Sequence, residues 1–67
     1  MISDSSVKVV IADDHPLILA GLANELEKIE GVMIVARETN GLDAIKSINY
    51  HKPHLVILDV QMPGNHI

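Results

Sequence analysis

The stretch Val7-Lys8-Val9-Val10-Ile11-Ala12-Asp13-Asp14 decides the fold of this 67-residue chain. Residues 7–12 are mostly apolar and β-branched, which predicts a short strand buried on both faces of a parallel sheet. A similar run, Leu55-Val56-Ile57-Leu58, is followed by Asp59. Because parallel strands bring their C-terminal residues to one edge of a sheet, the three carboxylates are expected to meet there if these two strands are neighbours.

Patterns typical of helices and strands alternate along the rest of the chain. Pro16 fits the first turn of a helix, and Gly31 stands where a left-handed helix cap is commonest. Leu42, Ile45 and Ile48 are spaced to share one face of a second helix. The predicted strands cover about residues 7–12, 32–37 and 55–60, and the predicted helices cover about residues 16–30 and 41–49.

The order strand-helix-strand-helix-strand, with short connections, predicts an α/β fold. Right-handed crossovers build such a chain into a parallel sheet with helices on both faces. The first and third strands can share the acidic edge only in the spatial order 2-1-3, which puts the second strand at an edge. This arrangement is half of a flavodoxin-like (CheY-like) three-layer sheet, whose ligand crevice lies between the first and third strands.

Three converging carboxylates raise one another's pKa or recruit a cation. Mg²⁺ prefers oxygen ligands, takes one or two carboxylates, and keeps other positions for water and phosphate. Taken alone, the pair Asp13-Asp14 is equally well explained as a solvated turn that caps a helix. Adding Asp59 at the end of another apolar strand favours a metal site and points to phosphate chemistry.

Composition excludes several other functions. The formal net charge is −4, and the five basic residues are scattered singly, so nucleic-acid binding by this segment is not expected. The N-terminus lacks the pattern of a secretory signal, and no apolar run approaches the length of a membrane span. With no cysteine in the chain, a cytoplasmic protein without membrane contact is expected.

The two acidic segments together carry a family resemblance. Residues 9–17, with the form Asp-Asp-His-Pro, and residues 55–64, ending in Met-Pro-Gly, resemble the receiver domain of bacterial two-component response regulators. With Gly21, the first segment is similar to the subclass whose output domain is a LuxR/NarL-type helix-turn-helix. The resemblance implies that Asp59 is the phosphoacceptor and that a sensor histidine kinase supplies the phosphate.

The resemblance also implies a Mg²⁺ cofactor. Asp14 corresponds to the direct metal ligand, Asp13 to the residue that holds metal-bound water, and Asp59 to a further ligand. The main-chain carbonyl of Gln61 completes the protein ligands. A full receiver of this family has a further Ser or Thr, a Lys and an aromatic residue in its second half, so residues 1–67 are expected to be the N-terminal part of a receiver.

The expected function is therefore a non-enzymatic phosphoacceptor module that, when intact, regulates a DNA-binding output domain. One alternative is a truncated fragment that acts only by self-association, for example as a dimer, or by pairing with a receiver. Another is a small Mg²⁺-dependent aspartyl phosphohydrolase, although such enzymes usually place Asp-x-Asp after the first strand. The histidines are interpreted as turn residues: His15 before Pro16, and His51 and His54 facing solvent around Pro53. The alternative for His15, which lies beside the carboxylates, is an electrostatic influence on the site.

Overall fold

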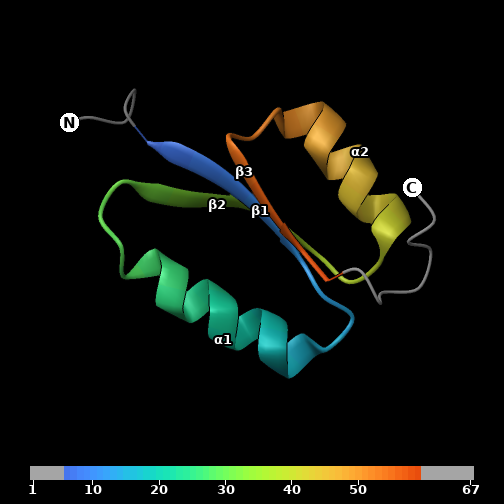
Figure 1. Ribbon diagram of the computed structural model, residues 1–67, viewed down its shortest axis with the longest axis horizontal. Coiled ribbons are helices and arrows are strands. Elements are labelled where there is room, and N and C mark those ends of the chain that lie inside the picture. Colours follow the sequence, from blue (N-terminus) through green and yellow to red (C-terminus); the bar gives the residue numbers. More distant parts are fainter. Residues whose placement is uncertain (1–5, 60–67) are drawn as a thin grey trace.

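Two helices cover opposite faces of a three-stranded parallel sheet in the computed structural model, which describes residues 6–59 (Figure 1). The strand order is β2-β1-β3, and both pairings are parallel. This confirms the predicted order 2-1-3 and the flavodoxin-like class, with β2 at an edge. The elements are β1 (Val7–Ala12), α1 (Pro16–Glu27), β2 (Val32–Glu38), α2 (Gly41–His51) and β3 (Leu55–Leu58).

The central strand β1 supplies most of the core. Its last four residues, 9–12, are each 2% exposed or less. Val9 and Ile11 pack with Leu19 of α1, whereas Ala12 packs with Ala44 of α2. Successive side chains of a strand point to opposite faces. One apolar run therefore anchors both helices, and fully burying a side chain such as that of Ile11 stabilises the fold by about 1.5–3 kcal/mol.

Helix α1 ends at Glu27, before the predicted end at residue 30. The N–H of Lys28 donates to the Glu25 carbonyl at 3.2 Å, and the N–H of Ile29 donates to the Leu26 carbonyl at 3.0 Å. These bonds span three residues instead of four, so the last turn tightens and the α-helix stops. Gly31 has a φ of +90°, as its sequence position suggested, but it lies in the turn that follows.

Helix α2 runs to His51, beyond the predicted end at residue 49. Its first turn is capped by Asn40, whose Oδ1 accepts the N–H of Asp43 at 2.8 Å. Pro53 disfavours the right-handed helical conformation for Lys52, the residue before it. The Lys52 N–H still donates to the Ile48 carbonyl at 2.9 Å, and Lys52 caps the helix with a left-handed φ of 51°.

The buried face of α2 differs from the predicted one. Gly41 and Ala44 are the buried residues of this helix, whereas Leu42 is 59% exposed. Ala44 packs against Ala12 with Leu58 beside it, and small residues at this contact let the helix approach the sheet closely. The helix is therefore rotated so that Leu42 lies outside the contact with the sheet.

None of the helices described within residues 6–59 has the length and apolar character needed to cross a membrane.

Candidate functional site

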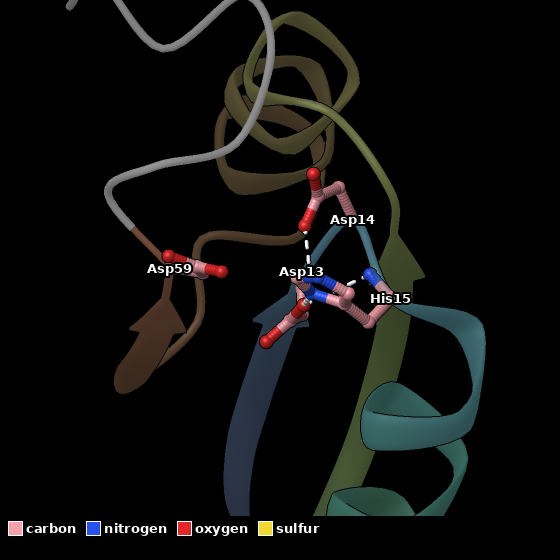
Figure 2. A group of neighbouring side chains, drawn as sticks. All are labelled: Asp13, Asp14, His15 and Asp59. Atoms are coloured by element: carbon pink, nitrogen blue, oxygen red, sulfur yellow. Dashed lines mark hydrogen bonds and ion pairs between the residues drawn. The ribbon is translucent and has the colours of Figure 1, made fainter.

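The C-terminal ends of β1 and β3 bring three carboxylates to one edge of the sheet (Figure 2). Ala12 and Leu58 are paired across the two strands, and Asp13 and Asp59 directly follow them. The N–H of Asp59 donates to the Ala12 carbonyl at 3.1 Å, and the N–H of Asp13 donates to the Glu38 carbonyl at 3.0 Å. Main-chain bonds on both sides of β1 thus determine where the acidic residues leave the sheet.

The imidazole of His15 lies among these carboxylates. One potential ligand atom from each of Asp13, Asp14, His15 and Asp59 lies within 4.8 Å of the others. Nδ1 of His15 is 2.8 Å from Oδ1 of Asp13 and 2.8 Å from Oδ1 of Asp14. The favoured interpretation of His15 as a turn residue does not include this contact, whereas the alternative, an electrostatic influence on the site, agrees with it. The only signal in the sequence was its position next to the acidic pair.

The contact between His15 and Asp13 shifts the protonation of both groups. A side-chain hydrogen bond to Asp13, followed by the charge of Asp14, raises the pKa of His15 above its ordinary value of 6.5. The same side-chain hydrogen bond, and a second one from the His15 N–H, lower the pKa of Asp13 below 3.8. A protonated His15 therefore supplies positive charge to the acidic edge, although water screens it because its side chain is 61% exposed.

Asp14 has the environment of a residue that can bind a cation. Among the described residues, its Oδ1 is buried and accepts no hydrogen bond, although it lies at ion-pair distance from His15 Nδ1. An unsatisfied buried oxygen is costly, and a bound cation removes that cost. With Asp13 and Asp59 nearby, the carboxylate oxygens form a donor set that suits Mg²⁺. The fourth predicted ligand, the Gln61 carbonyl, lies outside the described residues, as does the loop over residues 62–64.

A side-chain bond between α2 and β2 and a main-chain bond to Asp13 support the surroundings of the site. The Ser47 hydroxyl of α2 donates to Oε2 of Glu38 at the end of β2. The Glu38 carbonyl in turn accepts the Asp13 N–H. The acidic edge is therefore tied through β2 to the helix on one face of the sheet.

A parallel sheet of order β2-β1-β3 with acidic residues after β1 and β3 is the arrangement of a flavodoxin-like receiver fold. The chain belongs to the response regulator receiver domain family, whose profile matches residues 9–66. This confirms the family suggested by the two acidic segments, and it makes the chain a receiver module of a two-component response regulator.

Individual relatives agree with this assignment. The response regulator GacA of Pseudomonas aeruginosa is 40% identical over 58 residues, which are 87% of this chain and 27% of that protein. The receiver domain of the putative response regulator NarL from Mycobacterium tuberculosis matches with a TM-score of 0.87 and 37% identity, over 90% of this chain and 48% of that chain.

A second solved relative is the isolated REC domain of RcsB from Salmonella enterica serovar Typhimurium, determined in the presence of the phosphomimetic BeF3−. It matches with a TM-score of 0.84 and 36% identity, over 91% of this chain and 44% of that chain. The chain thus spans about a quarter of the length of GacA and about half of these two receiver structures.

Proposed function

We propose that this chain is a phosphoacceptor module in which Asp59 receives a phosphoryl group at a Mg²⁺ site formed with Asp13 and Asp14. The observation that carries this proposal is the convergence of these side chains within 4.8 Å at the carboxyl edge of β1 and β3, in a chain of the receiver family. Ligands of open α/β sheets bind at such an edge.

The chemistry follows from the position of Asp59. A carboxylate oxygen of Asp59 attacks the phosphorus atom in line, and the bond from phosphorus to the leaving oxygen of the donor breaks. When bound, Mg²⁺ offsets the repulsion between the anionic nucleophile and the anionic donor. Asp14 offers its unsatisfied Oδ1 as a ligand, while Asp13 is held in place by its bonds to His15 and Glu38.

The partners belong to the same proposal. We infer that a sensor histidine kinase donates the phosphate, and that in a longer protein the module controls a DNA-binding output domain. Structures of RcsB from Salmonella enterica serovar Typhimurium bound to promoter DNA illustrate such an output in a relative. We also infer a cytoplasmic location and no enzymatic turnover of an external substrate. GacA, NarL and RcsB support this as response regulators, although another relative is a protein-glutamate methylesterase.

Labelling with acetyl phosphate and Mg²⁺, followed by mass spectrometry, tests this proposal. We expect one phosphoryl group on the wild-type chain and none on Asp59→Asn. Glu30→Gln is a matched control, because it also removes one negative charge but at an exposed residue in the turn before β2. Label that persists in Asp59→Asn would exclude Asp59 as the acceptor.

Self-association is a second candidate function, and one observation favours it. Within residues 6–59, β3 has a strand neighbour on one side only, and Leu55 at its start is 47% exposed. Open strand edges promote pairing with another chain. No feature of the site favours the phosphohydrolase alternative, because the acidic pair after β1 is adjacent instead of being spaced as Asp-x-Asp.

A further inference from the structure

His54, the residue directly before β3, is bonded twice to β1. Its main-chain N–H donates to the Lys8 carbonyl at 2.9 Å. Its imidazole Nδ1 accepts the main-chain N–H of Lys8, also at 2.9 Å. His54 was predicted to face solvent in a turn; it is exposed, but its side chain forms part of the connection between the two strands.

The imidazole takes the place of a main-chain acceptor. In a regular parallel ladder, a carbonyl of the neighbouring strand accepts an N–H such as that of Lys8. Here the chain enters β3 through the left-handed Lys52 and the ring of Pro53, and His54 supplies a ring nitrogen as the acceptor. A main-chain N–H is an obligatory donor, so Nδ1 must present its lone pair and the ring proton of neutral His54 must be on Nε2.

This contact has a direct relation to Asp59, because β3 is only four residues long. The His54 bonds hold its first end, and the bond from the Asp59 N–H to the Ala12 carbonyl holds its last end. Among the described residues, β1 is the only strand paired with β3. A short edge strand with few bonds is free to shift, and a shift of one residue turns every side chain to the opposite face.

We propose that His54 is a positioning residue for Asp59: its Nδ1 clamps the start of β3 to Lys8 and so holds the Asp59 carboxylate in register with Asp13 and Asp14. This inference rests on the proposed function of Asp59 as phosphoacceptor. Displacing a reacting group by about 1 Å can slow a reaction by about a hundredfold. A clamp at the far end of a four-residue strand can therefore control the labelling rate without touching the phosphate.

The test compares three variants of the full chain. His54→Ala removes the acceptor, whereas His54→Asn places an amide oxygen close to the position of Nδ1. His51→Ala is the control, because it removes a neighbouring histidine that contacts the ring of Tyr50 and has no bond to β1 among the described contacts. For each chain, we would measure the labelling rate at saturating acetyl phosphate and the hydrogen exchange of individual amides.

We expect His54→Ala to lower the maximal labelling rate about tenfold and to speed exchange of the Asp59 N–H about fivefold, as loss of one hydrogen bond predicts. Exchange of the Asp13 N–H, which is bonded to β2, should stay unchanged. His54→Asn should recover most of the rate, and His51→Ala should equal the wild type. A normal maximal rate in His54→Ala, or no recovery in His54→Asn, would overturn the positioning role.

Two further measurements separate this inference from the proposed function. If the wild-type chain accepts no label, the phosphoacceptor role fails, and exchange of the Asp59 N–H in His54→Ala still decides whether the clamp holds β3. If His54→Ala does not fold, the test uses NMR spectra of the wild-type chain instead. A scalar coupling across the N–H···N hydrogen bond from the Lys8 N–H to His54 Nδ1 would support the clamp. Absence of that coupling, with Nδ1 protonated in neutral His54, refutes it.

Discussion

The substitution Asp14→Asn should change stability and Mg²⁺ affinity in opposite directions. Potential ligand oxygens of Asp13, Asp14 and Asp59 lie within 4.8 Å of one another. At that separation, two unit charges in a dielectric like that of water repel by about 0.9 kcal/mol. A neutral amide at position 14 removes this repulsion at alkaline pH, where His15 is neutral and offers no compensating charge.

At alkaline pH and without metal, we therefore expect the free energy of unfolding of Asp14→Asn to exceed that of the wild type by about 1 kcal/mol. This difference corresponds to a rise in Tm of roughly 4–8 °C for a domain of this size. The same change removes an anionic ligand whose Oδ1 is buried and has no hydrogen bond among the described residues. Mg²⁺ affinity should fall at least about tenfold, because even loss of an outer-sphere partner of a metal site costs that much.

Circular dichroism melts without metal and calorimetric titration with Mg²⁺ measure the two effects. Glu30→Gln provides the control, since it makes the same charge change at an exposed residue in the turn before β2 and should leave affinity unchanged. Equal Mg²⁺ affinity in Asp14→Asn and the wild type would remove Asp14 from the metal site. A lower Tm in metal-free Asp14→Asn would show that repulsion at the acidic edge is not the dominant energy there.

Three further outcomes are expected. The ion pair of His15 and Asp13 should stabilise the metal-free fold most between pH 3.8 and 6.5. Because folding raises the pKa of His15, the contribution of His15 is lost as pH rises through this raised pKa. Because folding lowers the pKa of Asp13, the contribution of Asp13 is lost as pH falls through this lowered pKa. Melts of the wild type and His15→Asn across pH should converge at both extremes, and a constant difference would contradict the pairing. Ile11→Val should lower the free energy of unfolding by about 0.5–1.5 kcal/mol, because Ile11 is fully buried. Ile29→Val is the control: this side chain is 53% exposed, so the free energy of unfolding should change by no more than about 0.5 kcal/mol. Equal losses for the two variants in urea titrations would refute the core assignment. Sedimentation equilibrium over a hundredfold dilution should reveal concentration-dependent association through the open edge of β3, and a folded monomer at every concentration would exclude it.

Local sequence determined the elements and the acidic edge of this protein. The β-branched run 7–12 is typical of a strand buried on both faces, and strand-helix-strand connections strongly favour a right-handed parallel arrangement. The order β2-β1-β3 followed from one further requirement, that Asp59 should meet Asp13 at one edge. Each of these inferences depends on residue type and spacing along the chain, which are properties of the sequence itself.

Tertiary structure decided the details that depend on contacts between distant segments. The rotation of α2, which buries Ala44 and exposes Leu42, is set by the close contact of that helix with Ala12. The bond of His54 to Lys8 spans 46 residues, and no local pattern specifies an imidazole as the acceptor for a strand N–H. His15 contacts its sequence neighbours Asp13 and Asp14 directly, whereas only the folded sheet brings Asp59 to the same edge and adds its negative charge near that ring.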